Sequence, residues 1–499
     1  MKPKKALLYC SQYIRRVIHP EKYVTLRTLC EYAGVDCRTL SSVVKKRLNK
    51  KVWHICTDRM LITPPNSVWW VNCIQDADLA MQRKALVILT DKQFGNHPCI
   101  VVKNPIEVFA KMCLYFRLMQ KEIKVTAVTG SIGKSTTSGM LVSVYSAYKK
   151  TYYSPGFGNE PFEIGYSVQH IPARYPLMVQ EICENIPNAT QFSSMMTAPS
   201  LAIITAIDKA HFGTFGSVDN IAAEICGVVK GLPANAPVVV DKTEFRWMDL
   251  LDGHPPITVS DVDSTADYFA KDIHVTSSGL TFNIVDSSNN TEHHVSLVNI
   301  YAHHNVMAAL RVFAAARHMG IPYNTITEGL SRYRTTGIRQ NIVKADNDIL
   351  IYADCYNALA SSVKAAIKAA DTIPIKGQRW AVLGDIEGCG EISSDQHEEC
   401  MEAIDLSSFG GLVTVGKKMN AATASYQWKR QLEVHPCQSK DEAEKVLKKH
   451  IASGDMVLLK SSHGGDLSTI IEHLWPDALQ KANEYNKKYR HWKFSSAVR

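Results

Sequence analysis

The amino-acid sequence predicts an α/β protein of about three domains. The chain has 499 residues, and a single hydrophobic core rarely organises more than about 250–300. From Ile123 onward, short apolar runs alternate with longer helical patterns, which is typical of parallel strands covered by helices. The same alternation begins again after Arg339. We therefore expect two domains with parallel sheets, preceded by a smaller domain.

The composition predicts a globular protein of the cytoplasm. Hydrophobic residues make up 45% and charged residues 21% of the chain, which indicates neither disorder nor a membrane protein. The apolar run after the basic start is interrupted by Gln12, Arg15 and Arg16, so we expect no signal peptide and no membrane anchor. The 13 cysteines form no CxxC pair, and we expect reduced, mostly buried thiols.

The first domain, residues 1–110, is expected to be a small α/β unit. Strand-like runs occur at residues 87–90 and 99–102, and a helical stretch follows at 109–118.

The central domain, residues 111–334, is expected to contain a parallel sheet. Buried strands are predicted at residues 125–128, 177–179 and 201–205. Alternating apolar and polar residues between 261 and 296 predict antiparallel strands, and a helix is expected at 304–318.

The third domain, residues 335–499, repeats the alternation of strands and helices. Its strands are predicted at residues 349–352, 380–383, 412–415 and 456–459. We see no internal repeat and no low-complexity linker, so the domains are expected to connect through short hinges.

Basic residues crowd the start of the chain and raise the alternative of a DNA-binding protein. Residues 24–44 resemble a helix-turn-helix, with a turn at Gly34 between two short amphipathic helices. Leu26, Leu29 and Ala33 can equally pack a short helix into a small domain while the lysines stay solvated. We favour this second interpretation and expect no nucleic-acid partner. The basic residues are Lys2, Lys4, Lys5, Arg15, Arg16, Lys22, Arg27, Arg38, Lys45, Lys46, Arg47, Lys50 and Lys51.

The most specific motif is a phosphate-binding loop between a predicted strand and a predicted helix. In such a loop the backbone N–H groups and the helix N-terminus face phosphate oxygens. Lys134 can reach the terminal phosphates, and the Ser135 hydroxyl can bind Mg²⁺. The spacing is shorter than in the ordinary P-loop, which would need glycine at Val128. The loop consists of Gly130, Ser131, Ile132, Gly133, Lys134, Ser135 and Thr136.

The shorter loop and the motifs that follow it resemble the Mur ligase family over about three quarters of the chain. The elements Asp-x-Tyr-Asn-Ala from Asp354 and Lys-x-Ser-x-Gly from Lys460 are most similar to the branch that adds D-alanyl-D-alanine to a UDP-N-acetylmuramoyl-tripeptide. The matching positions along the chain are Asn159, Glu181, Asn185, His211, Asn305, Arg339, Asp354, Tyr356, Asn357, Lys460 and Ser462.

The resemblance implies the three-domain Mur ligase architecture, with a central P-loop ATPase-type parallel sheet and a Rossmann-like C-terminal domain. It implies an ATP- and Mg²⁺-dependent ligase of peptidoglycan synthesis that activates a carboxylate as an acyl phosphate and joins it to an amine. The N-terminal domain would then hold the acceptor. The partners would be a small or carrier-linked carboxylate and an amino acid or dipeptide, and we expect a monomer.

The resemblance also implies roles for individual residues. Ser135 and Glu181 would hold Mg²⁺, and His211 would serve a second metal ion. Asn305 would recognise adenine, and Arg339 would contact the phosphates once the domains close. The C-terminal residues Asp354, Tyr356 and Asn357 would face the nucleotide. The substrates would be bound by Asn159, Asn185, Lys460 and Ser462.

Two departures from the family pattern leave alternatives open. The position of the family's carbamylated, metal-bridging lysine is Ile225, and isoleucine cannot bind a metal. Glu224 can supply the carboxylate instead, the second metal can be held more weakly, or catalysis can have been lost. The glycine-rich segment expected in the first domain is replaced by residues 72–80, and Glu160 starts a loop that is asparagine-rich in the family. The alternatives are therefore a Mur-like ligase with a non-UDP acceptor and a nucleotide-binding protein without independent catalysis.

Overall fold

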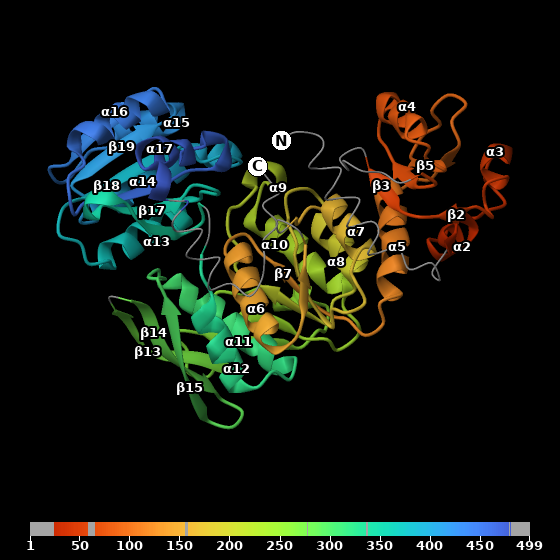
Figure 1. Ribbon diagram of the computed structural model, residues 1–499, viewed down its shortest axis with the longest axis horizontal. Coiled ribbons are helices and arrows are strands. Elements are labelled where there is room, and N and C mark those ends of the chain that lie inside the picture. Colours follow the sequence, from red (N-terminus) through yellow and green to blue (C-terminus); the bar gives the residue numbers. More distant parts are fainter. Residues whose placement is uncertain are drawn as a thin grey trace.

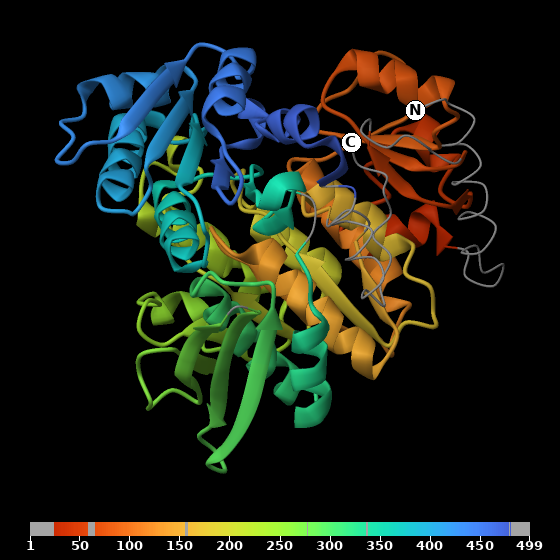
Figure 2. The same ribbon diagram turned by 60° about the vertical axis from the view of Figure 1, so that its left-hand side comes forward.

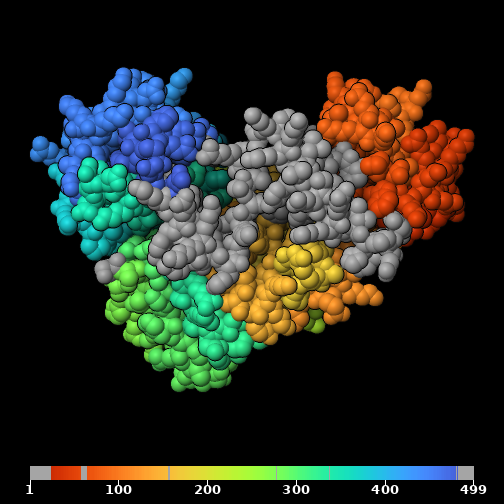
Figure 3. Space-filling model, viewed as in Figure 1, coloured from red at the N-terminus to blue at the C-terminus, as the bar shows by residue number. Residues whose placement is uncertain are grey.

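A computed structural model of the protein describes residues 24–57, 65–154, 158–276, 278–335, 338–478 and 480. Figure 1 shows an N-terminal part and a C-terminal part at opposite ends of a central part. The turned view in Figure 2 shows the same arrangement, and Figure 3 shows it in space-filling form. Each part is built on its own sheet, so the predicted α/β class is confirmed. The boundaries at residues 110 and 334 stay a prediction.

The chain enters the described region through a small unit of two helices and two short strands. Thr25 and Ser41 cap the two helices with side-chain oxygens, and Leu26 and Leu29 are fully buried. The second helix has four residues, about 6 Å of length, which gives the helix-turn-helix interpretation no support. The elements are β1 (Val24–Thr25), α2 (Leu26–Tyr32), α3 (Ser42–Lys45) and β2 (Lys51–Val52), with β1 and β2 antiparallel.

A parallel four-stranded sheet follows, in the order β3-β4-β5-β6. The two strands predicted in this domain are β5 and β6. The helix predicted at 109–118 begins earlier, because Asn104 caps it and Pro105 occupies its first position. The elements are β3 (Ile55–Thr57), β4 (Val68–Trp70), α4 (Ile74–Gln82), β5 (Val87–Thr90), β6 (Cys99–Val101) and α5 (Pro105–Leu118).

Aromatic rings join this sheet to the central part. The Trp70 and Phe162 rings stack with centroids 4.6 Å apart, and Phe109 lies against both. The ring of the half-buried His54 also stacks on that of the buried His170, with centroids 4.6 Å apart. Such rings bury a large apolar area, so the N-terminal sheet is firmly packed on the central part.

The central sheet has nine strands in the order β15-β14-β13-β12-β11-β10-β7-β9-β8. In this order, the strands from β12 through β11, β10, β7 and β9 to β8 pair in parallel. Strands β13, β14 and β15 form a series of hairpins, in which β13 pairs with β14 and β14 with β15 in antiparallel fashion. Both predicted patterns are thus confirmed. The strands are β7 (Lys124–Thr129), β8 (Thr151–Tyr153), β9 (Leu177–Glu181), β10 (Leu201–Ile204), β11 (Val238–Asp241), β12 (Pro256–Ser260), β13 (Tyr268–Thr276), β14 (Gly279–Asp286) and β15 (Thr291–Val298).

Helices cover both faces of this sheet (Figure 1). Helices α6, α11 and α12 pack on one face, and α5, α7 and α8 pack on the other. Helix α11 has the predicted bounds. The helices are α6 (Lys134–Tyr148), α7 (Pro161–Gln169), α8 (Ala189–Thr197), α9 (Phe212–Phe215), α10 (Val218–Cys226), α11 (His304–His318) and α12 (Tyr323–Arg332).

The C-terminal sheet has six strands in the order β16-β17-β21-β18-β19-β20, parallel except for β16. Helices α13, α14 and α15 contribute to the core on one face, and α16 and α17 to the core on the other. The elements are β16 (Asn341–Lys344), β17 (Leu350–Asp354), α13 (Ala360–Thr372), β18 (Arg379–Gly384), α14 (Ser393–Asp405), β19 (Gly411–Val415), α15 (Lys417–Ser425), β20 (Glu433–Cys437), α16 (Lys440–His450), β21 (Met456–Lys460) and α17 (Ser468–Leu474).

The described cysteines fit the expectation of reduced, mostly buried thiols. All are free, and all except the half-buried Cys73 are buried. Cys10 lies outside the described residues. No helix in the described part of the chain has the length and apolar character needed to cross a membrane.

Candidate active site

The candidate site lies where three neighbouring strands of the central sheet end. Strands β10, β7 and β9 are adjacent and parallel, so the loops that follow them meet at one edge of the sheet. From β7 the chain first runs to β8, the outermost strand, and then returns to β9 and β10, which lie on either side of β7. The carboxyl ends of these strands therefore form a topological switch point. Open α/β sheets bind ligands at such points.

The phosphate loop between β7 and α6 has the conformation that its glycines permit. Gly130 has φ +129°, and a Cβ there would lie 2.3 Å from Thr205 Oγ1. Gly133, with φ +87°, precedes the first residue of α6. The loop after β10 supports this turn, because Ser131 N donates to Ala206 O at 2.7 Å and Thr205 Oγ1 donates to Ile132 O at 2.6 Å. The α6 N-terminus is thereby presented at the switch point.

The Lys134 ammonium is held by a carboxylate that the motif comparison does not single out. Lys134 Nζ lies 2.9 Å from Glu184 Oε1 and 2.8 Å from Glu184 Oε2, and it also donates to Gly130 O. The Glu184 side chain is fully buried, and that of Lys134 is 12% exposed. The only sequence signal for Glu184 is a second glutamate three residues after Glu181.

Ser135, Glu181 and Asn159 come together as a candidate Mg²⁺ site. Ser135 Oγ donates to Glu181 Oε1 at 3.1 Å, and Asn159 Nδ2 donates to the same oxygen at 2.8 Å. Glu181 is 3% exposed, and its other oxygen, Oε2, has no hydrogen-bond partner among the described residues. A buried carboxylate oxygen without a donor suits a hard cation, so these residues fit Mg²⁺. Thr136 follows half-buried on α6.

Two further predicted residues lie on the loops around this group. His211 is exposed and has φ +56° directly before α9. Desolvation of its ring lowers the pKa of His211, while the charge of Glu184 raises it. Asn185 is half-buried on the loop after β9, where its Oδ1 accepts from Cys183 Sγ at 3.2 Å. Both residues therefore lie near the switch point.

The hydrogen bonds of Glu224 give it a structural role. Its two carboxylate oxygens accept from Asn188 N at 2.6 Å and Thr190 N at 2.8 Å, so the side chain caps the start of α8. Burial raises the pKa of Glu224, and these backbone bonds oppose that effect. Ile225 points into the core and is fully buried.

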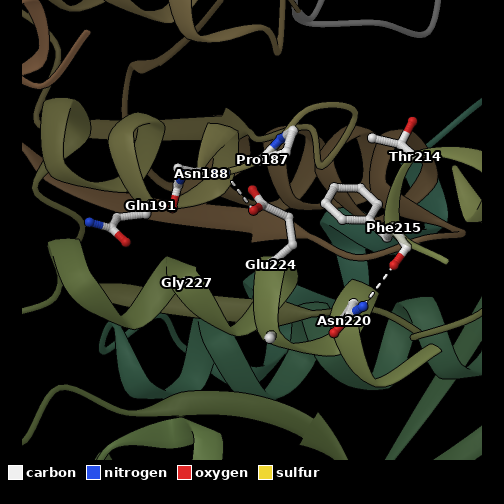
Figure 4. A pocket seen from close by; sticks show the side chains of 9 residues that line it. Pro187, Asn188, Gln191, Thr214, Phe215, Asn220, Glu224 and Gly227 are labelled. Carbon is white, nitrogen blue, oxygen red and sulfur yellow. Dashed lines mark hydrogen bonds between the residues drawn. The ribbon is translucent and has the colours of Figure 1, made fainter. Parts of the chain in front are cut away.

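Glu224 also lines a cavity of about 320 Å³ between α8, α9 and α10. Figure 4 shows Glu224 facing Asn188 in this cavity, with Phe215 on the other side. None of the phosphate-loop residues lines it. Both oxygens of Glu224 thus accept hydrogen bonds from the start of α8 in this structure, and the assignment of Glu224 to a second metal ion stays a prediction.

Asn305 contacts Gln340, which lies on the segment that leads into the C-terminal sheet. Asn305 is 1% exposed, and its Nδ2 donates to Ala302 O at 3.0 Å and Gln340 Oε1 at 3.2 Å. Its Oδ1 has no partner among the described residues. This acceptor is available to an exocyclic amino group such as that of adenine.

Gln340 connects Asn305 to the C-terminal strands, because its backbone N–H donates to Asp354 Oδ1 at 3.3 Å. The Asp354 and Lys460 side chains lie side by side on paired strands, with Asp354 Oδ2 2.8 Å from Lys460 Nζ. Lys460 Nζ also donates to Asn357 O at 2.8 Å, and Lys460 is only 2% exposed. The lysine predicted to bind substrate is thus buried and engaged by protein groups.

The remaining C-terminal residues lie at the same strand ends. The Arg339 guanidinium carbon lies 3.4 Å from the ring centroid of Tyr356, an exposed residue. Ser462 Oγ accepts from Glu387 N at 3.0 Å. Thr336 and Gly337, which precede Arg339 in the motif, lie outside the described residues.

The C-terminal part touches the loop after β10. Gly213 N donates to Gly388 O at 3.2 Å, and Ser361 Oγ donates to the Asp208 carboxylate. Lys209 Nζ lies 4.0 Å from Glu399 Oε1. The carboxyl edge of the central sheet and the loops of the C-terminal sheet therefore face one another.

The comparisons with known proteins agree with this geometry. Residues 128–316 match the family described as Mur ligase middle domain, and residues 338–463 match the family described as Mur ligase, glutamate ligase domain. The UDP-N-acetylmuramoyl-tripeptide–D-alanyl-D-alanine ligase of Bacillus subtilis is 26% identical over 381 residues, which cover 76% of this chain and 81% of the relative.

Two solved structures are similar over nearly the whole chain. MurF from Acinetobacter baumannii has a TM-score of 0.77 at 20% identity and covers 91% of this chain and 99% of its own. MurF ligase from Thermotoga maritima, solved in complex with ADP, has a TM-score of 0.71 at 18% identity, with coverages of 89% and 100%. These likenesses show the shared fold, including the N-terminal part.

Proposed function

Because this chain belongs to the Mur ligase family, we propose that it is an ATP-dependent ligase that joins a carboxylate to an amine in peptidoglycan-precursor synthesis. The observation that carries the proposal is the switch point. There Lys134 and Ser135 begin α6 and Glu181 ends β9 at one edge of the sheet, and the loops of the C-terminal sheet face that edge. ATP is the proposed phosphoryl donor, with Mg²⁺ as the metal ion.

The reaction has two chemical steps. A carboxylate oxygen of the acceptor attacks the γ-phosphorus of ATP, and ADP leaves. The amine nitrogen then attacks the acyl carbon, and inorganic phosphate leaves through a tetrahedral intermediate. Both steps bring several anionic groups together, so the protein must supply cations and N–H donors there.

The residues of this chain can supply them. The backbone N–H groups after Gly130 and the α6 N-terminus would bind phosphate oxygens. Lys134 would bind the terminal phosphates. Mg²⁺ held by Ser135 and Glu181 would offset the charge of the β- and γ-phosphates. From the C-terminal side, Arg339 would reach the phosphates if it leaves the face of Tyr356.

For the substrates we propose a carboxylate acceptor and an amino acid or dipeptide. The B. subtilis relative is named for a UDP-N-acetylmuramoyl-tripeptide and D-alanyl-D-alanine, which makes these the first pair to test. A non-UDP acceptor is the second candidate, because residues 74–82 form helix α4 where the family pattern has a glycine-rich segment. We propose that the protein acts as a monomer.

The proposal is tested by incubating the protein with ATP and Mg²⁺ against a panel of acceptors and amines. We expect ADP and phosphate to appear only when both substrates are present, with the amide product identified by mass spectrometry. The panel should hold UDP-linked and UDP-free carboxylates. Nucleotide binding without product from any pair would favour the non-catalytic alternative.

A further inference from the structure

We infer that Glu184 is a divalent-cation ligand that exchanges Lys134 for a metal ion when a nucleotide binds. The inference rests on the proposed function, and it names a residue that neither the sequence motifs nor the family matches assign.

The starting point is a buried ion pair in which both members are confined. Glu184 has no exposed side-chain area, and both its oxygens lie within 2.9 Å of Lys134 Nζ. Lys134 is the only cationic side chain within ion-pair distance of Glu184 in the described ranges. The lysine charge is thus fully matched while no phosphate is present.

A nucleotide changes this balance. If the terminal phosphates attract Lys134, Glu184 loses the cation that made its burial tolerable. A buried carboxylate without a partner is strongly unfavourable, so another cation must take the place of the ammonium. Carboxylate oxygens are the ligands that Mg²⁺ prefers, and the ion enters these sites together with phosphates.

The surroundings favour a metal ion at this position. Ser135 and Lys134 are successive residues on α6, and they contact Glu181 and Glu184 respectively. Both carboxylates belong to the end of β9 and the loop that follows it. Glu181 Oε2, which lacks a partner among the described residues, supplies a further free oxygen there. Two buried carboxylates thus contact the first two residues of α6, next to the phosphate loop.

Glu224 is the alternative carboxylate, and its geometry is less suitable. Its oxygens accept backbone bonds of 2.6 and 2.8 Å from Asn188 and Thr190, which a metal ion would have to break. To bind a metal ion, Glu184 has to release only the Lys134 side chain, which the phosphates of the nucleotide would then bind.

The first experiment counts bound ions with Mn²⁺ as the probe. Wild type and Glu184→Gln are titrated with Mn²⁺ in the presence of a non-hydrolysable ATP analogue, and free Mn²⁺ is followed by electron paramagnetic resonance. We expect Glu184→Gln to bind one ion fewer, or to bind it at least about tenfold more weakly. Asp241→Asn is the matched control, because Asp241 is a buried carboxylate paired with Arg311 at 3.4 Å. An unchanged ion count in Glu184→Gln, or loss of the ion from Glu224→Gln instead, would overturn the inference.

The second experiment removes the competing lysine and uses no nucleotide. In Lys134→Met, Glu184 has no cation, so Mn²⁺ should bind to the nucleotide-free protein at least about tenfold more tightly than to wild type. Equal affinities would contradict the exchange of lysine for metal. Both experiments measure binding only, whereas ligation by the wild type tests the proposed function independently. Circular dichroism verifies that each variant is folded.

Discussion

At the scale of single residues, we expect the ion pair of Lys134 and Glu184 to affect both the stability of the protein and its ligase activity. We expect Lys134→Ala to abolish ATP-dependent ligation, because no other side chain of the loop carries a positive charge. The variant should also be less stable by on the order of 3 kcal/mol, since it leaves a buried carboxylate without its partner. Ligation assays and urea unfolding measure the two effects.

The double variant Lys134→Ala/Glu184→Gln separates the loss of stability from the loss of ligation. It should regain much of the lost stability while remaining inactive, because the unpaired charge is gone but the phosphate contact is still missing. A stability loss equal to that of Lys134→Ala would mean that the ion pair is not the cause.

Asn305 provides a second prediction at this scale. Its Oδ1, which has no partner among the described residues, is a hydrogen-bond acceptor. It can accept from the amino group of adenine, whereas the carbonyl oxygen of guanine offers no donor at that position. Asn305→Ala should therefore raise KM for ATP by about tenfold and narrow the preference for ATP over GTP. Steady-state kinetics with both nucleotides measures this. A uniform loss with both nucleotides would assign Asn305 a purely structural role.

The sequence motifs named residues that the structure brings together, such as Ser135, Glu181 and Asn159, and their roles stay predictions. The family resemblance assigned Ser135 and Glu181 to the same metal ion, and the structure places the two side chains in contact. Glu184 was missed, since a motif comparison finds only positions that the family already uses. Glu224 was chosen by its distance from Ile225 along the chain. Only the fold reveals that α10 directs that side chain to the backbone of α8.

At the scale of elements, the packing of the N-terminal sheet on α7 predicts a dependence of stability on pH. Burial lowers the pKa of His54 to about 3, with His170 adding to the effect, and burial lowers that of His170 to about 4. In the unfolded chain both titrate near 6.5. Between the folded-state and unfolded-state pKa values, the unfolded chain binds more protons than the folded protein. The histidines therefore make their full contribution to the free energy of unfolding above about pH 6.5, and this contribution is lost as the pH falls.

The expected loss is about 1.4 kcal/mol per pH unit for each histidine within that window. His54→Phe keeps a ring for stacking and removes one titrating group, so its stability should fall less steeply with acid than that of wild type. Thermal melts between about pH 4 and pH 6.5, with further points above pH 6.5 where stability should be constant, compare the two proteins. Parallel curves for the two proteins would rule out His54 as a contributor.

Long elements with clear signals were predictable from the sequence, and short edge strands were not. Helix α11 was predicted with its observed bounds, because its apolar residues form a long uninterrupted pattern. Strand β20 was missed, since its five residues include Pro436 and are mostly partly exposed at the edge of the sheet. Strand β16 was also missed, since it is a four-residue strand at the other edge of the same sheet.

At the scale of the whole molecule, ligation should depend on the contact between the central and C-terminal parts. Gly390 has φ +57°, and a Cβ there would lie 2.8 Å from Gly213 Cα. We expect Gly390→Ala to force these two parts away from each other and to lower kcat by about tenfold or more, with nucleotide binding retained. Ligation rates and small-angle X-ray scattering measure this.

Gly388→Ala is the matched control. Gly388 also has a positive φ, +75°, but no atom lies within 4 Å of the position of its Cβ. Both glycines lie at the contact with Gly213 and both variants introduce backbone strain, but only the Cβ added at Gly390 meets Gly213. Equal losses in both would attribute the effect to strain alone.

The order of the elements along the chain was enough to predict the α/β class and the kind of strand pairing in the two larger sheets. Alternating strands and helices led to parallel sheets, and polar alternation led to the hairpin series β13 to β15. The way in which the parts face one another was beyond such reasoning. It depends on individual contacts such as those of Asp208 with Ser361 and Trp70 with Phe162, which carry no local sequence pattern.

The burial of the thiols makes the protein suitable for selective labelling. Burial raises the pKa of the Cys30, Cys56 and Cys226 thiols to about 12, so these groups are both inaccessible and protonated at neutral pH. In the described ranges only Cys73 is partly accessible, at the start of α4 on the N-terminal part. With Cys10 replaced, a maleimide fluorophore should react at this one position of the folded protein. The native Cys73 would then carry a reporter at the start of α4, and acceptor binding could be followed by fluorescence without introducing a new cysteine.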